Sequence, residues 1–82
     1  MDLLNLTQEI ILSLVKDKDI VAVKEFPSEN ENEVLLEVLI SESDMPRVIG
    51  KSGKVINSVR TIVQASSYLK DNKKVKINID SI

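Results

Sequence analysis

The sequence has 82 residues, 43% apolar and 2% aromatic, with a formal net charge of −2, which fits one small domain with a single hydrophobic core. It contains no cysteine and no histidine, and this excludes disulfides, thiolate or imidazole metal sites, cysteine nucleophiles and serine–histidine pairs. We therefore expect one non-enzymatic domain, residues 1–82, without catalytic residues, bound metal or cofactors.

The first predicted element is an amphipathic helix over residues 3–16. Leu3, Ile10, Ile11 and Leu14 recur at helical spacing, and the polar run KDKD follows them. The segment has an acid at position 2 and polar residues every few positions, so it resembles neither a signal peptide nor a membrane span. We expect a cytoplasmic protein that does not bind a membrane.

Two strands come next, over residues 20–26 and 34–40. The segments IVAVKEF and VLLEVLI are rich in β-branched or aliphatic residues, and Pro27 with the polar run SENENE predicts a turn between them. We expect a hairpin, with Phe26 in the core at a strand end. The acidic loop lacks the ligand and glycine spacing of an EF-hand, so we interpret it as a solvated hairpin tip rather than a calcium site.

A short helix and a long helix follow. Ser43 or Asp44 can cap the short helix, Pro46 fits its first turn, and it ends at Gly50. Apolar residues then keep a period of 3.6 residues from residue 54 to about residue 69, which predicts a second and longer helix.

The last predicted element is a strand. The segment VKINID, residues 75–80, alternates apolar and polar side chains, as in a strand with one buried and one solvated face. The element order is therefore α-β-β-α-α-β, which indicates an α+β fold.

The charges are distributed unevenly along the chain. Residues 1–43 carry ten acids and three bases, a net charge of −7, whereas residues 44–82 carry eight bases and three acids, a net charge of +5. Such asymmetry is typical of a surface that faces nucleic acid or a membrane, although a solvated charged face is the simpler alternative. In a nucleic-acid-binding protein, the basic half must face the ligand while the acidic half points away.

Both glycines of the chain lie three residues apart in the segment RVIGKSGKVI, residues 47–56. In the simplest explanation, Gly50 is a helix C-cap and Gly53 is a turn residue, and neither has any further role. The lysines beside them favour a further role, because a simple corner needs no cations. A helix that begins at Gly53 leaves its first N–H groups unpaired, and glycine lets a sugar-phosphate chain approach that backbone closely. The loop is therefore a candidate phosphate-binding site.

Two nucleotide-binding motifs can be excluded at this loop. A P-loop ending in GKS would need another glycine at position 45, where the chain has Met45, and a preceding strand rather than a short helix. A dinucleotide-binding fingerprint needs three glycines after a strand, and the whole chain has two.

The segment VIGKSGKVI, residues 48–56, resembles the IGxxGxxI core of the KH (K-homology) RNA-binding domain. The predicted element order resembles the type II KH fold, a three-stranded sheet with helices packed on one face, and the whole chain is similar to the bacterial KhpA family. The resemblance implies a GxxG loop that clamps single-stranded RNA while the bases lie in an adjacent apolar groove. Ile56, which also flanks the loop, is equally well explained by core packing. The RNA-binding residues expected on this basis are Ile49, Gly50, Lys51, Ser52, Gly53, Lys54, Arg60 and Arg47.

The scarcity of aromatic residues agrees with binding of this type. Phe26 and Tyr68 are the only aromatic residues, so the stacking platforms of RRM, OB and cold-shock domains are missing. We expect Tyr68 to pack against the protein with its hydroxyl group at the surface.

The resemblance implies a small RNA-binding protein that acts in post-transcriptional regulation or as an RNA chaperone. The alternative is a protein-interaction subunit for which RNA contact is secondary, since KhpA-like proteins are understood to associate with a second KH-containing protein, KhpB. We expect single-stranded RNA as the ligand and either a KhpB-like partner or a homodimer, because two linked RNA sites raise the effective affinity.

Overall fold

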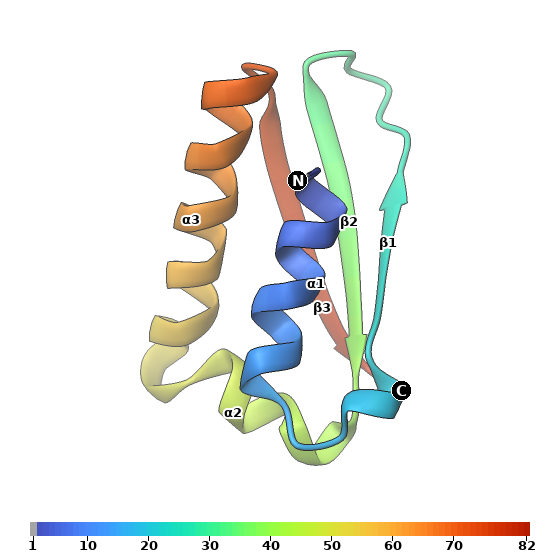
Figure 1. Cartoon of the computed structure of the whole chain (residues 1–82), viewed down its shortest axis with the longest axis vertical. Coiled ribbons are helices and arrows are strands. Elements are labelled where there is room, and N and C mark those ends of the chain that lie inside the picture. The colour runs from blue at the N-terminus through green and yellow to red at the C-terminus, as the bar shows by residue number, and fades with distance from the viewer. Residues whose placement is uncertain (1) are drawn as a thin grey trace.

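The computed structural model of the chain describes residues 2–82 and has the predicted order of elements (Figure 1). Short 3-10 turns lie at Lys18–Ile20, Glu42–Asp44 and Lys51–Gly53. Every predicted helix and strand is present, with ends at most two residues from their predicted positions. The elements are α1 (Leu3–Leu14), β1 (Ala22–Phe26), β2 (Glu33–Ile40), α2 (Met45–Ile49), α3 (Lys54–Lys70) and β3 (Lys74–Ser81).

Helix α1 has a side-chain cap at each end. The Asp2 carboxylate accepts a hydrogen bond of 2.7 Å from the Asn5 backbone N–H and so satisfies one of the amides that a helix N-terminus leaves unpaired. At the other end, the Lys18 ammonium group donates to the carbonyls of Leu12 and Val15, at 2.6 and 3.0 Å. Val15 is already extended, so the helix stops two residues earlier than predicted.

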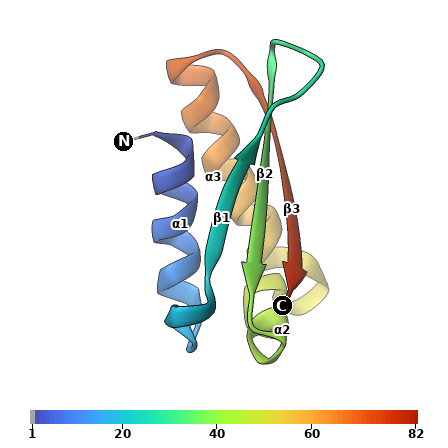
Figure 2. The same cartoon turned by 90° about the vertical axis from the view of Figure 1, so that its right-hand side faces the viewer.

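The three strands form one mixed sheet in the order β1-β2-β3. Strands β1 and β2 pair in an antiparallel hairpin, as predicted, whereas β3 pairs parallel to β2. A parallel neighbour requires a crossover connection, and α2 and α3 provide it. Figure 2 shows that α1 and α3 cover one face of the sheet and leave the other face open.

The hydrophobic core lies between the helices and the covered face of the sheet. Burial alternates along β2, where Leu36, Val38 and Ile40 are buried, as the period of two for a strand requires. The other buried apolar residues are Leu3, Ile11, Val15, Val48, Ile56, Val59, Val63 and Ile77.

Phe26 lies on the open face of the sheet and is 44% exposed, so the prediction that it belongs to the core is wrong. It pairs with Leu35 across the hairpin. Successive side chains of a strand point to opposite faces, and Leu36 points toward the helices. Leu35 and Phe26 therefore point away from them.

Candidate nucleic-acid interface

The segment between α2 and α3 bends through backbone conformations that favour glycine. Gly50, Ser52 and Gly53 have positive φ angles of 77°, 56° and 76°. Gly50 also has a ψ of 175°, a combination that is open essentially to glycine alone. A Cβ atom at Gly50 would overlap with the Val55 side chain and lie 2.9 Å from the Val55 nitrogen. This glycine therefore lets the first turn of α3 pack directly against the end of α2.

Gly53 has a milder requirement than Gly50. Its φ of 76° and ψ of 13° lie in the left-handed region, which asparagine and aspartate also adopt at modest cost. A Cβ atom here would meet only the Asn57 amide nitrogen, at 3.6 Å. The geometry thus requires glycine more strictly at position 50 than at position 53.

The bend lies on the surface and leads into an uncapped helix. Lys51 and Ser52 are exposed, and Gly50 and Gly53 are half-buried. Among residues 2–82, no side chain caps the N-terminus of α3. The N–H groups of Gly53 and Lys54 donate to the carbonyls of Gly50 and Lys51, so the amides left for a ligand are those that follow Lys54 in the first turn. Amides at the positive end of a helix dipole attract phosphate groups.

Three of the predicted cations lie at this bend. Lys51 lies within the bend and Lys54 is the first residue of α3, and both are exposed. Arg47 comes from the last turn of α2, where its Nε atom lies 3.8 Å from a carboxylate oxygen of Asp44 while half of its side chain stays exposed. Fold and sequence therefore place positive charge beside the available amides.

Arg60 lies farther along α3, and the two isoleucines that flank the bend are turned toward the core. The Arg60 guanidinium group donates to the Asn57 side-chain oxygen and to the Ile77 carbonyl, both at 3.2 Å, so it reaches from α3 to β3. Ile56 is 4% exposed, which confirms the core-packing explanation for it. Ile49 is partly buried and packs against the core.

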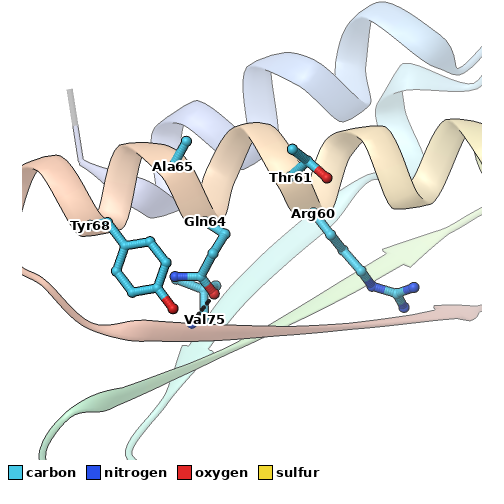
Figure 3. A pocket seen from close by; sticks show the side chains of 6 residues that line it. All are labelled: Arg60, Thr61, Gln64, Ala65, Tyr68 and Val75. Carbon is cyan, nitrogen blue, oxygen red and sulfur yellow. Dashed lines mark hydrogen bonds between the residues drawn. The ribbon is translucent and has the colours of Figure 1, made fainter.

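An open groove of about 460 Å³ runs between α3 and the outer edge of β3 (Figure 3). Gln64 bridges the two elements: its amide nitrogen donates to the Lys73 carbonyl and its amide oxygen accepts from the Val75 N–H, both at 2.9 Å. Since β3 is an edge strand, these bonds occupy backbone groups that no neighbouring strand can pair. The groove is lined by Arg60, Thr61, Gln64, Ala65, Tyr68 and Val75.

Tyr68 lines this groove with a side chain that is 55% exposed. The predicted packing role therefore accounts for only part of its surface, and its place in the groove is a finding of the structure. A signal was present in the spacing, because Arg60, Gln64 and Tyr68 recur every four residues and so share one side of a helix. Spacing alone does not show that this side faces β3.

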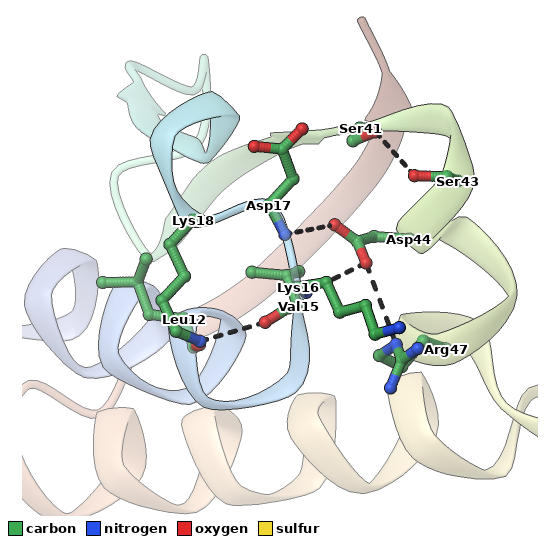
Figure 4. Close-up of polar contacts among 9 residues, drawn as sticks. All are labelled: Leu12, Val15, Lys16, Asp17, Lys18, Ser41, Ser43, Asp44 and Arg47. Atoms are coloured by element: carbon green, nitrogen blue, oxygen red, sulfur yellow. Dashed lines mark hydrogen bonds and ion pairs between the residues drawn. The ribbon is translucent and has the colours of Figure 1, made fainter.

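Asp44, which directly precedes α2, is bonded to the segment that follows α1 (Figure 4). It occupies the N-cap position of α2 but makes no capping hydrogen bond, so the capping role predicted for it is wrong. Its carboxylate, 2% exposed, accepts hydrogen bonds from the backbone N–H groups of Lys16 and Asp17, both at 3.0 Å. These bonds hold the pKa of Asp44 below its usual value. Ser43, the other predicted cap, lies 3.0 Å from the Ser41 hydroxyl group.

A second pocket, of about 390 Å³, lies at the C-terminal end of α3. The Lys76 ammonium group, on β3, lies 3.7 Å from a Glu33 carboxylate oxygen. Basic residues from the second half of the chain thus lie beside acidic residues from the first half at Lys76 and in this pocket, so the two halves do not form fully separate surfaces. The lining combines apolar residues with charges of both signs: Asp2, Leu3, Glu25, Val34, Lys70, Asp71 and Lys73.

Two kinds of feature are absent from residues 2–82. No helix there is both long and apolar enough to cross a membrane. The same part of the chain holds no cluster of three or more potential metal-ligating side chains.

A family model and several known proteins match most of this chain in sequence. The sequence model described as "KhpA/KhpB, KH domain" matches residues 5–79. The RNA-binding protein KhpA of Clostridium perfringens is 39% identical over 74 residues, which cover 90% of this chain and 95% of that protein. The RNA-binding protein KhpA of Listeria monocytogenes is 35% identical over 77 residues, with coverages of 88% and 96%.

A solved structure shares the fold at lower sequence identity. It is Era in complex with MgGDPNP and nucleotides 1506–1542 of 16S ribosomal RNA, with a TM-score of 0.67 and 19% identity. The match covers 96% of this chain but only 29% of the Era chain. It supports the α+β KH fold.

Proposed function

This chain belongs to the KhpA/KhpB family of KH domains, and from this membership we propose that it is an RNA-binding protein that holds single-stranded RNA at its GxxG bend and in the groove beside it. Residues 1–82 act as one KH domain, without enzymatic activity and in the cytoplasm. The proposed RNA-binding residues are Ile49, Gly50, Lys51, Ser52, Gly53, Lys54, Arg60 and Arg47.

The exposed bend between α2 and α3 is the observation that carries this proposal. A phosphate group can approach Gly53 closely, because the space where its Cβ atom would lie is open apart from the Asn57 amide at 3.6 Å, and Lys51, Lys54 and Arg47 add positive charge. One phosphate at a helix N-terminus contributes about 0.3–1 kcal/mol, whereas micromolar affinity requires about 8 kcal/mol. Further contacts must therefore come from the rest of the site.

The groove between α3 and β3 supplies these contacts. RNA that follows α3 from the bend passes Arg60 first, whose guanidinium group is held in place by the Ile77 carbonyl. Beyond it, Ala65 and Val75 offer apolar surface against which bases can pack. The phosphates are thus bound at the bend and the bases in the groove.

A site of this kind fits a role in post-transcriptional regulation or as an RNA chaperone. Contacts to the sugar-phosphate backbone carry no sequence information by themselves, so the bend accepts many RNAs. Both roles need binding to exposed single-stranded segments and require no chemistry on the RNA.

The proposal is tested by placing negative charge in the bend. In the double variant Lys51→Asp with Ser52→Asp, carboxylates face the phosphates, and we expect binding of a labelled single-stranded RNA to be abolished in fluorescence anisotropy. Aspartate tolerates the left-handed backbone at position 52, so the circular dichroism spectrum and the unfolding midpoint should stay close to those of the wild type.

The matched control applies the same change in charge to the open face of the sheet. Lys74 and Asn78 are both exposed on β3, and Lys74→Asp with Asn78→Asp should keep RNA affinity within about threefold at equal ionic strength. Unchanged RNA affinity in the folded bend variant would refute the proposal.

A second candidate function, binding of a protein partner, is favoured by an uncovered apolar stripe on α3. Ile62 and Leu69 are 52% and 89% exposed, and their spacing of seven residues places them on one side of the helix. The partner we propose is a KhpB-like protein or a second copy of this chain. A partner that co-purifies after nuclease treatment, and that is lost on Ile62→Asp with Leu69→Asp, supports this function; loss of the partner with nuclease alone contradicts it.

A further inference from the structure

Tyr68 is placed unusually for a residue whose only role is packing. It is the chain's single tyrosine, there is no tryptophan, and the other aromatic residue is Phe26, which lies on the open face of the sheet. More than half of the Tyr68 side chain is exposed. The neighbouring core positions of α3 are filled by Val63 and Ser67, both fully buried. The core is therefore closed without the exposed part of the Tyr68 ring.

The groove around Tyr68 is rigid on one side and open on the other. Figure 3 shows Arg60, Gln64 and Tyr68 projecting from α3 toward β3, with the ring at one end of this row and the guanidinium group at the other. The amide of Gln64 is bonded at both its nitrogen and its oxygen to the backbone around β3, so it cannot rotate to cover the ring. Ala65, which also lines the groove, is too small to do so.

We propose that Tyr68 is a stacking contact for a nucleobase of bound single-stranded RNA. This inference rests on the proposed function and adds to it an aromatic platform at the end of the groove farthest from the bend. Every base has a π face, so stacking on an aromatic side chain stabilises binding with little dependence on sequence. The positive charge of Arg60 in the same groove favours a ligand that carries phosphates as well as bases.

The length of α3 sets the length of RNA that can use both contacts. Fifteen residues separate Gly53 from Tyr68, which at about 1.5 Å per residue is roughly 22 Å along the helix. At a stacked spacing of about 3.4 Å per nucleotide, a strand needs about seven nucleotides to cover this distance. An RNA of eight nucleotides therefore reaches from the bend to the ring.

The single tyrosine provides a direct optical test. Titration of the wild-type protein with eight-nucleotide oligo(A) or oligo(U) should quench the tyrosine emission at the same RNA concentrations that saturate anisotropy of the labelled oligomer. An eight-nucleotide ribose-phosphate chain without bases should bind more weakly and leave the emission unchanged, because it has nothing to stack.

Three variants separate stacking in the groove from a general effect of removing an exposed aromatic ring. Tyr68→Ala should weaken binding of the eight-nucleotide RNA by about 5- to 100-fold, whereas Tyr68→Phe, which keeps the ring, should bind within about twofold of the wild type. Phe26→Ala is the matched control, since it removes the other aromatic side chain, which is 44% exposed on the open face of the sheet and outside the groove. Circular dichroism and unfolding midpoints confirm that all three are folded.

The outcomes distinguish this inference from the proposed function. RNA binding with unchanged tyrosine emission and an unaffected Tyr68→Ala variant would overturn the stacking contact while leaving RNA binding at the bend intact. Absence of RNA binding by the wild-type protein would overturn both. Equal losses for Tyr68→Ala and Phe26→Ala would also overturn stacking in the groove, because the effect would then not depend on the position of the ring.

Discussion

The two ends of α3 both carry lysines beside a turn with left-handed residues, yet only one of them suits a phosphate group. The N-terminal end has the bend with Gly50 and Gly53. The C-terminal end has Asn72, with a φ of 53°, between Lys70 and Lys73. The two ends differ in the state of the backbone and in the sign of the helix dipole.

At the C-terminal end, the backbone groups are already bonded. The N–H groups of Asp71 and Asn72 both donate to the Ser67 carbonyl, at 2.8 Å, and the Ser67 hydroxyl and the Gln64 amide both donate to the Lys73 carbonyl. The dipole is negative at this end of a helix, so lysines here offset it instead of recruiting an anion. Carboxylates line the same pocket as these lysines.

At the N-terminal end, the dipole is positive and no side chain among the described residues caps the helix. Asp44, which begins α2, is turned inward toward the end of α1. Lysines next to a turn therefore indicate a candidate phosphate site only where amides are available and acids are turned away.

The largest expected effect comes from the glycine with the strictest geometry. Gly50→Asn should destabilise the protein by about 2–3 kcal/mol, through backbone strain and the overlap with Val55, and should abolish RNA binding. Gly53→Asn should cost less than about 1 kcal/mol, because asparagine tolerates the left-handed region. Urea unfolding and RNA anisotropy measure both effects.

Asn72→Gly, at the other end of α3, is the control for this pair. It removes a strained residue from the turn and should leave RNA affinity unchanged. Equal costs for Gly50→Asn and Gly53→Asn would show that the two glycines are interchangeable corner residues, which contradicts the geometry described for the bend.

Charge reversal at each end of α3 tests whether the two ends differ in RNA binding, through the salt dependence of the affinity. Lys51→Glu should weaken RNA binding about five- to tenfold and reduce the slope of log affinity against log salt by about 0.7–1. Lys73→Glu should change the RNA affinity by no more than about twofold and leave the slope as in the wild type, since Lys73 lies among carboxylates. RNA titrations at salt concentrations from about 50 to about 200 mM measure both slopes. Equal slopes for the two variants would show that the two ends of α3 do not differ in phosphate binding.

The smallest expected effect is a pH dependence from Asp44. Its pKa in the folded protein lies below the usual value of 3.8, so the folded state holds this proton less readily than the unfolded state. The resulting stability is complete above the usual pKa and is lost as the pH falls through that value toward the lowered one. Urea midpoints measured across this acid range should therefore fall less steeply for Asp44→Asn than for the wild type.

The exposed Asp19 provides the control for the loss of one carboxylate. Asp19→Asn should leave the steeper acid dependence in place. If Asp44→Asn and the wild type lose stability in parallel below the usual aspartate pKa, the bonds from the Asp44 carboxylate to the segment after α1 do not stabilise the fold.

Local sequence patterns were enough to predict the order of the elements, their ends to within two residues, and the position of the bend. These features depend on short-range physics: apolar periods of 3.6 and 2 residues, the preference of Pro46 for a first helical turn, and the conformational freedom of Gly50 and Gly53. Each can be read within a window of a few residues. The proposed roles of the bend residues in RNA binding stay predictions.

The contacts that side chains make with residues distant in the sequence became known from the packing of the elements. The carboxylate of Asp44 could cap its own helix, yet it binds amides 27 and 28 residues away. Hairpin register turned Phe26 outward, and the parallel docking of β3 beside α3 made Tyr68 part of a groove. These outcomes depend on how separate elements pack against one another, and local periodicity carries no information about that packing.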